Sequence, residues 1–310
     1  MLRSSLLWLS ERNGVFDFVK GNSVARKMAS RFVAGETPDT AIEAVTEINS
    51  TNLAASLDLL GESVTNEQEA VSARVEIVDV LERIKETGVD ANVSIKLTQM
   101  GLDLDLDSCA GNMRALLEVA RKHDIFVRID MESSQYTERT LTLFREQLYP
   151  EFGDLVGVVI QTCLYRAAQD VEDLINQGAR VRLVKGAYAE LASVAFPDKR
   201  DVDATYATLT ERLLSEGNYP AIATHDESLI DHARTYARER DIGPERFEFQ
   251  MLYGVRRDLQ QSLRQAGYNV RVYVPYGTQW YPYLMRRLAE RPANIAFMIG
   301  NVLKESLRWR

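Results

Sequence analysis

Polar side chains recur late in the β-rich segments of this 310-residue chain, where they could bind a ligand or take part in chemistry. In RVRLVKGAY, for example, Arg182 and Lys185 interrupt an apolar strand pattern. Any one such residue is more often a loop boundary or a surface ion pair. Together they predict a polar ligand, because burying several unpartnered charges is costly. They are Asp58, Glu62, Lys96, Thr98, Arg128, Asp130, Glu132, Gln161, Arg182, Lys185, Thr224, His225, Asp226, Gln250, Tyr273 and Tyr276.

A second polar group lies on the helix predicted at residues 281–291. At 100° per residue, one face of this helix carries Tyr283, Arg286, Arg287 and Glu290. Two guanidinium groups on one face can clamp a carboxylate or a phosphate. A solvated amphipathic face would show the same pattern, so this helix alone leaves both interpretations open.

Alternating strand and helix patterns place these side chains. Eight strands are predicted at 52–61, 91–98, 125–131, 156–163, 180–186, 220–226, 246–252 and 270–277. Helices are predicted between and after them at 66–87, 110–123, 137–148, 167–178, 203–217, 226–240, 257–267 and 281–291. This order favours right-handed crossovers and a parallel sheet, and eight units are the number that closes a (βα)8 barrel. An open doubly wound sheet is the alternative, but no GxGxxG follows the first strand.

The barrel hypothesis also divides the chain. Residues 1–50 are predicted to form a helical arm that packs on the barrel, and residues 51–310 to form the α/β barrel with its C-terminal helices. In such barrels the functional groups lie at the C-terminal ends of the strands, which is where the polar residues fall.

Composition excludes several classes of protein. The net charge of −8 argues against a nucleic-acid partner. The two cysteines, Cys109 and Cys163, form no CxxC pattern, so neither a disulfide framework nor a zinc site is expected. No apolar run is long enough to span a bilayer, and we expect a cytoplasmic protein. Basic residues at Arg26, Lys27 and Arg31 leave peripheral contact with the inner face of a membrane open.

Nine segments between residues 50 and 300 resemble the proline dehydrogenase family, including the equivalent domain of proline-utilisation flavoenzymes. In order, they are SIKLTQMGLDL, RIDME, VIQTCLYR, RLVKGAYAE, VAFPDK, ATHDE, FEFQMLYG, VRVYVPYG and YLMRRLAERPAN. The resemblance implies a distorted (βα)8 barrel that holds non-covalent FAD without a Rossmann fingerprint. It implies oxidation of L-proline to 1-pyrroline-5-carboxylate, with electrons passed to a quinone. A separate pyrroline-5-carboxylate dehydrogenase is a further partner that the resemblance leaves open.

The resemblance also implies residue roles. Arg182, Asp130 and Tyr273 match catalytic positions, with Arg182 near the reactive end of the flavin. Lys96, Arg286 and Arg287 match the site for the proline carboxylate, and Glu62 matches an acid that pairs with Arg286 as a gate. The remaining cofactor contacts are Met131, Gln161, Lys185, Gly186, Ala187, Tyr188, Thr224, His225 and Glu290, with Thr224 and His225 at the adenosine end.

Two alternatives and one chemical question stay open at this point. Lys96 or Lys185 could act as a Schiff-base nucleophile in an aldolase-like barrel, or the barrel could bind an amino acid without chemistry. In the flavin mechanism, hydride leaves the ring carbon next to the proline nitrogen. The nitrogen must also lose a proton, for which water is as suitable an acceptor as Asp130.

Overall fold

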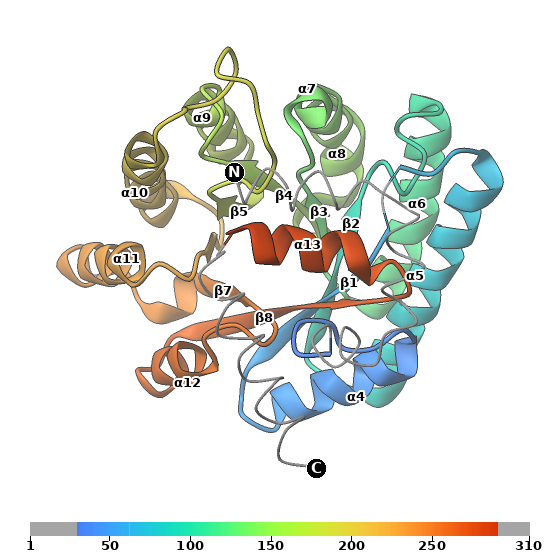
Figure 1. Cartoon of the computed structure of the whole chain (residues 1–310), viewed down its shortest axis with the longest axis horizontal. Coiled ribbons are helices and arrows are strands. Elements are labelled where there is room, and N and C mark those ends of the chain that lie inside the picture. The colour runs from blue at the N-terminus through green and yellow to red at the C-terminus, as the bar shows by residue number, and fades with distance from the viewer. Residues whose placement is uncertain (1–29, 62, 291–310) are drawn as a thin grey trace, which may run out of the picture.

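The strands form a closed parallel barrel in the computed structural model, which describes residues 30–61 and 63–290, with side chains up to Met285 (Figure 1). Each strand pairs with the next, and β8 returns to β1, where Ala55 lies opposite Val272. The predicted (βα)8 barrel is therefore confirmed, and the open sheet is wrong. The strands are β1 (Ala54–Leu59), β2 (Ala91–Lys96), β3 (Val127–Asp130), β4 (Val156–Gln161), β5 (Arg180–Val184), β6 (Ala221–Ala223), β7 (Glu248–Leu252) and β8 (Asn269–Tyr276).

Helices surround the barrel and follow the predicted order. The helix predicted at 137–148 is α7 followed by a π-helical turn, Phe144–Leu148. None of the helices in the described part of the chain is long and apolar enough to cross a membrane. The α-helices are α4 (Pro38–Asn49), α5 (Glu67–Thr87), α6 (Leu106–His123), α7 (Ser134–Leu143), α8 (Tyr149–Phe152), α9 (Ala167–Gln177), α10 (Lys199–Glu216), α11 (Glu227–Glu239), α12 (Arg257–Gln265) and α13 (Trp280–Glu290).

Short polar side chains fix where several of these helices begin, and so set the loops at the barrel's ends. Asn66 and Asp105 each accept a hydrogen bond from a backbone N–H in the first turn of α5 and α6. Asp226 does the same for α11. At the other end of a helix, Gly178 follows α9 with a φ of 77°, the left-handed conformation expected of a C-terminal cap.

The first and last described helices break the regular pattern of the barrel. Helix α4 packs on the outside of β1 and β8, and so covers the seam where the barrel closes. Helix α13 lies across the strand ends instead of beside β8 (Figure 1). Its buried side chains form a separate small core with Val33 and Leu60. The barrel is thus distorted, as the resemblance implied, while the division at residue 50 stays a prediction.

The barrel interior is polar along much of its length. Arg128, predicted at the functional rim, is instead directed toward the N-terminal ends of the strands, which corrects that expectation. Its Nη1 donates to the carbonyls of Val158 at 3.2 Å and Arg180 at 2.6 Å, and its guanidinium lies over Phe126. A Cβ on Gly157 would lie 2.7 Å from that Nη1, so this glycine provides the space for the guanidinium.

Glu248 is a buried acid in the same part of the barrel interior as Arg128. It contacts Arg271 at 3.1 Å and accepts a hydrogen bond from Gln250. Burial alone would raise the pKa of Glu248, but Arg271, Gln250 and Arg128 hold it below the usual 4.5. A carboxylate with a lowered pKa in the folded state stabilises the fold above its unfolded pKa, and this contribution disappears as the pH falls through the folded pKa.

We therefore predict that replacing Glu248 with glutamine flattens the acid limb of the stability curve. The free energy of unfolding should fall more steeply in the wild type than in Glu248→Gln once the pH drops below about 4.5. At neutral pH the variant should be less stable by about 3–5 kcal/mol, because Arg271 loses its buried partner. Urea denaturation from pH 7 to pH 3 measures both effects. Glu245→Gln, which removes an exposed charge, is the control, and parallel wild-type and Glu248→Gln curves would contradict the assignment.

Candidate active site

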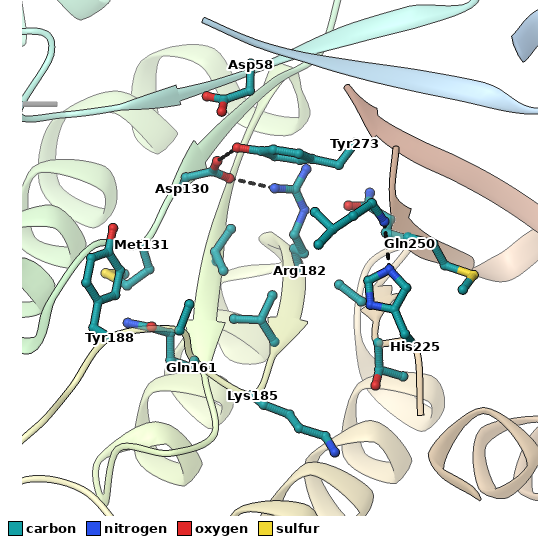
Figure 2. A pocket seen from close by; sticks show the side chains of 18 of the residues that line it. Asp58, Asp130, Met131, Gln161, Arg182, Lys185, Tyr188, His225, Gln250 and Tyr273 are labelled. Carbon is teal, nitrogen blue, oxygen red and sulfur yellow. Dashed lines mark hydrogen bonds and ion pairs between the residues drawn. The ribbon is translucent and has the colours of Figure 1, made fainter. Parts of the chain in front are cut away.

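A cavity of about 440 Å³ opens at the C-terminal ends of the strands (Figure 2). Every strand contributes to its wall, and Tyr283 of α13 lines it as well. This is the end of a (βα)8 barrel where functional groups are expected. In the described part of the chain, no group of three His, Cys, Asp or Glu side chains could hold a metal ion.

The structure brings twelve of the predicted site residues together in this wall. They are Lys96, Asp130, Met131, Gln161, Arg182, Lys185, Gly186, Ala187, Tyr188, Thr224, His225 and Tyr273. The other four lie outside the described residues or side chains: Glu62, Arg286, Arg287 and Glu290. The placement supports the set as one site, while the role of each residue stays a prediction.

Arg182, which is buried, forms a hydrogen-bonded group with the half-buried Asp130 and Tyr273 at one end of the cavity (Figure 2). Arg182 Nη1 donates to Asp130 Oδ1 at 2.6 Å, and the Tyr273 hydroxyl donates to Asp130 Oδ2 at 2.6 Å. The Arg182 guanidinium also lies over the Tyr273 ring, 5.3 Å from its centroid. Burial, with Asp130 and Asp58 nearby, raises the pKa of Tyr273 well above its usual value, so the phenol stays protonated and keeps donating. The carboxylate of Asp130 is thus occupied at both oxygens.

Lys96 lies beside this group and is paired with Asp58. Its Nζ is 2.7 Å from Asp58 Oδ1, and both side chains are almost fully buried. Burial raises the pKa of Asp58, and the opposing charge of Lys96 partly offsets that effect. An adjacent acid favours the charged ammonium, whereas a Schiff-base nucleophile must be neutral. The geometry therefore favours a cation that binds an anion over the aldolase-like alternative.

Lys185 lies at the other end of the cavity (Figure 2), and it too is paired with acidic side chains. Its Nζ contacts Asp203 at 2.6 Å and Asp226 at 2.9 Å. His225 is fixed nearby because its Nε2 accepts a hydrogen bond of 2.9 Å from the backbone N–H of Leu252. A ring nitrogen that accepts a hydrogen bond carries no proton, so this His225 nitrogen is unprotonated.

Several rim residues of the sequence pattern support the wall instead of lining it. Glu132 accepts hydrogen bonds from the backbone N–H and the hydroxyl of Thr98, at 3.1 and 2.6 Å. The backbone carbonyl of Glu132 accepts a hydrogen bond of 2.8 Å from Gln161 Nε2, and this contact orients the Gln161 amide. Tyr276 is buried but is not part of the cavity wall.

Sequence reasoning did not assign roles to other residues that the structure places here. Asp58 and Gln250 stood at strand ends but received no role, although both line the cavity. Lys199 lines it too, from a helix that begins four residues before its predicted start at 203. Ser94, which contacts Arg182, had one available signal: it precedes Lys96 by two residues and so faces the same side of β2.

Comparison with known proteins identifies the family. A family model described as proline dehydrogenase matches residues 41–299. The chain belongs to the proline dehydrogenase family. "Proline dehydrogenase 1" of Bacillus subtilis strain 168 is 44% identical over 305 residues, which cover 98% of this chain and 100% of that protein. "Proline dehydrogenase" of Deinococcus radiodurans is 40% identical over 308 residues, which cover 98% of both chains.

Solved structures agree with this family. The crystal structure of proline utilization A from Bdellovibrio bacteriovorus, inactivated by N-propargylglycine, superposes with a TM-score of 0.81 at 26% identity. The match covers 89% of this chain and 34% of that longer one. The predicted proline dehydrogenase activity, the oxidation of proline to 1-pyrroline-5-carboxylate, is therefore confirmed at the level of family and enzyme class. A barrel that binds an amino acid without chemistry does not fit this family.

Proposed function

We propose that the cavity binds FAD without a covalent bond and that proline is oxidised against it. The observation that carries this proposal is the state of Arg182. Its side chain is 95% buried, and its Nε has no hydrogen-bond partner among the described residues. An unsatisfied buried donor is costly, and a bound acceptor would satisfy it. When bound, FAD supplies the acceptor for the hydride that leaves the ring carbon beside the proline nitrogen.

Gly186 is the second feature that fits a bound cofactor. Its φ is 107°, and a Cβ at this position would lie 2.4 Å from Cys163 Sγ. Only glycine adopts this backbone conformation without strain, and the missing side chain lets this loop pack closely against Cys163 and beside Gln161, which lines the cavity. The neighbouring Ala187 and Tyr188 also line the cavity, as expected for a loop that contacts the cofactor.

The test of this function is an absorbance spectrum of the purified protein before and after anaerobic addition of L-proline. We expect flavin bands that bleach with proline, and protein that releases free FAD on denaturation. A colourless protein that gains no flavin bands when FAD is added would contradict the proposal. Trapping with borohydride in the presence of proline is the control for Schiff-base chemistry at Lys96 or Lys185, and we expect no stable adduct.

The substrate carboxylate is proposed to bind Lys96 together with Arg286 and Arg287. Lys96 provides a fixed charge next to the Arg182 group, and the two arginines belong to the last turns of α13, whose earlier residue Tyr283 lines the cavity. The predicted gate between Glu62 and Arg286 and the predicted cofactor contact of Glu290 stay proposals. These three side chains lie outside the part of the chain that the structure describes.

The contacts of Asp130 bear on the proton that proline must lose. Both of its oxygens already accept short hydrogen bonds, one from Arg182 and one from Tyr273. These two hydrogen bonds commit the carboxylate to holding the Arg182 and Tyr273 side chains in place. We therefore favour water as the proton acceptor and assign Asp130 to orienting Arg182 and Tyr273. Transfer of the electrons to a quinone completes the proposed reaction, and quinone reduction by the proline-reduced protein tests it.

Replacing Gly186 with alanine should remove the cofactor while the barrel stays folded. Strain of about 1–3 kcal/mol in the loop should weaken flavin binding by about 5- to 150-fold. Gly267→Ala is the matched control, because its φ of 92° is equally unusual for alanine but nothing lies within 4 Å of the added Cβ. Flavin content per protein and circular dichroism measure the two effects. Similar flavin loss in both variants would contradict a specific role for Gly186.

A further inference from the structure

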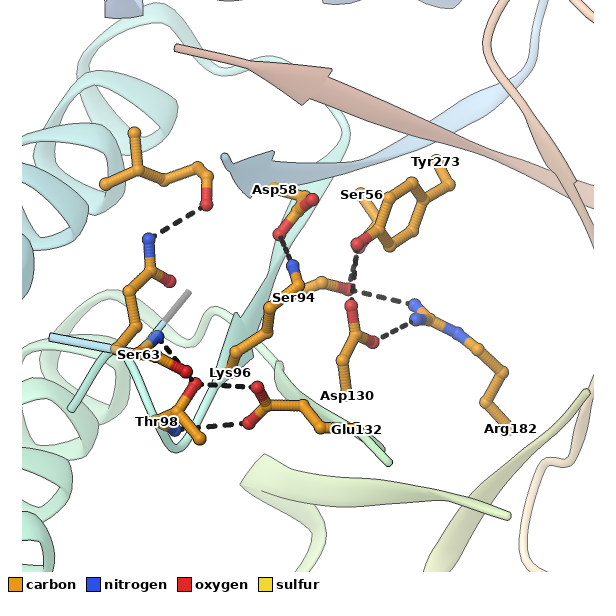
Figure 3. Close-up of polar contacts among 12 residues, drawn as sticks. Ser56, Asp58, Ser63, Ser94, Lys96, Thr98, Asp130, Glu132, Arg182 and Tyr273 are labelled. Atoms are coloured by element: carbon orange, nitrogen blue, oxygen red, sulfur yellow. Dashed lines mark hydrogen bonds and ion pairs between the residues drawn. The ribbon is translucent and has the colours of Figure 1, made fainter. Parts of the chain in front are cut away.

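Arg182 is held from a second direction by a residue outside the cavity. Its Nη2 donates to Ser94 Oγ at 3.0 Å, while Nη1 is bound to Asp130 (Figure 3). Ser94 is fully buried and does not line the cavity, so it touches neither a bound substrate nor a bound cofactor there. Whatever Ser94 contributes to the reaction, it contributes through Arg182.

The direction of this hydrogen bond is fixed by chemistry. A guanidinium has five N–H donors and no acceptor, so the Ser94 hydroxyl oxygen must accept. The same oxygen lies 2.9 Å from Ser56 Oγ on β1, and both serines are buried. With its oxygen accepting from Arg182, Ser94 can donate its own proton to Ser56. The Ser94 hydroxyl on β2 thus anchors a guanidinium that comes from β5, across the barrel interior, while Ser56 on β1 contacts Ser94 and not the guanidinium (Figure 3).

Two hydrogen bonds restrict the orientation of the Arg182 guanidinium more than one hydrogen bond does. A guanidinium bound only at Nη1 can pivot about that contact, whereas contacts at Nη1 and Nη2 fix the position of the group along its outer edge. The Tyr273 ring, 5.3 Å from the guanidinium carbon, then limits tilting on one face. Once these three contacts are made, the direction of the Nε–H bond is set. Nε is the buried donor that has no partner among the described residues.

We infer that Ser94 is a positioning residue that sets the plane of the Arg182 guanidinium and thereby the direction of its Nε–H bond. The inference rests on the proposed flavin function, because Arg182 is the residue assigned to the reactive end of the cofactor. Preorganised donors stabilise developing charge only when their orientation is fixed before the reaction. Ser94 therefore affects how well the bound flavin is reduced, and not whether proline or flavin binds.

The experiment compares Ser94→Ala with Ser56→Ala in flavin-loaded protein. Ser94→Ala removes the acceptor of Arg182 Nη2, whereas Ser56→Ala removes the neighbouring hydroxyl and leaves that acceptor in place. For Ser94→Ala we expect flavin reduction by proline to slow by about tenfold. Its KM should change little, and its flavin midpoint potential should become more negative because the cation stabilises the reduced flavin less well. Ser56→Ala should match the wild type, and Ser94→Thr, which keeps the hydroxyl, should restore rate and potential.

The outcomes separate this inference from the proposed function. Wild-type flavin that proline does not bleach would overturn the function itself. Wild-type flavin that bleaches, with an unchanged rate and potential in Ser94→Ala, would overturn only the role of Ser94. Equal losses in Ser94→Ala and Ser56→Ala would also overturn it, because they would show a general effect of packing inside the barrel.

A double-mutant cycle adds a readout that structural damage alone would not give. In an Arg182→Met background, Ser94→Ala should cause no further slowing, because the group that it positions is absent. Additive losses would contradict the inference. Should Ser94→Ala fail to fold, Ser94→Cys keeps the size of the side chain and replaces the hydroxyl with a weak acceptor, and it is expected to show the same shifts in rate and potential.

Discussion

Replacing Arg182 with methionine should slow the reduction of bound flavin by proline by about 10²–10³-fold, the usual effect of removing one preorganised donor. Methionine keeps much of the side-chain volume, so the loss reports charge and hydrogen bonding more than packing. Asp130 would keep only the hydrogen bond from Tyr273, and we also expect the variant to be less stable by about 3–5 kcal/mol. Anaerobic stopped-flow absorbance measures the rate, and urea denaturation measures the stability.

Arg180→Met is the matched control for this prediction. Arg180 belongs to the same strand two residues earlier, and its guanidinium stacks between the rings of Phe126 and Tyr219, outside the cavity wall. This variant should lose stability and keep its rate of flavin reduction. If both variants lost rate to the same degree, the special role of Arg182 would be excluded.

Replacing Lys96 with methionine should raise the KM for proline by about 30-fold or more, since removing one member of a buried charge pair typically costs about 2–5 kcal/mol. Flavin content should stay near that of the wild type, because Lys96 is assigned to the substrate carboxylate and not to the cofactor. Steady-state kinetics and the flavin absorbance of the same preparation measure the two quantities.

Asp58, the acid paired with Lys96, provides the control for this prediction. Lys96→Met leaves Asp58 as a buried acid without its cation, which destabilises the protein independently of substrate binding. The double variant Asp58→Asn/Lys96→Met removes that leftover charge, and it should recover stability without recovering affinity for proline. Recovery of proline affinity in the double variant would show that Lys96 serves only to neutralise Asp58.

The order of elements could be predicted from the sequence because each strand and helix has its own periodicity. The barrel followed from eight strand–helix units, and polar strand ends predicted the location of the site. The placement of α13 across the strand ends could not be predicted, because periodicity gives the order of helices and not where they pack. Its buried side chains pack on Val33 and Leu60, which are distant from α13 in the sequence.

The second feature that could not be predicted from the sequence is how far along the barrel axis each interior side chain reaches. Arg128 and Asp130 are two residues apart on β3 and face the same interior, yet Arg128 is bound to the carbonyls of Val158 and Arg180, whereas Asp130 lines the cavity. Alternation tells which side of the sheet a residue faces, but not how far along the axis its side chain reaches. That distance depends on strand register and on the space at Gly157. Ser94 was missed because a single serine in a strand carries no signal of its partner.

The seam covered by α4 has a consequence for synthesis of the chain on the ribosome. The apolar face of α4, with Ala41 and Val45 fully buried in the finished fold, packs on β1 and β8. Residues 50–268 must be translated before β8 appears, so the part of this face that packs on β8 stays uncovered through most of translation. Exposed apolar surface during that delay invites aggregation. The nascent chain is therefore expected to need a chaperone until the last strand has been released from the ribosomal tunnel.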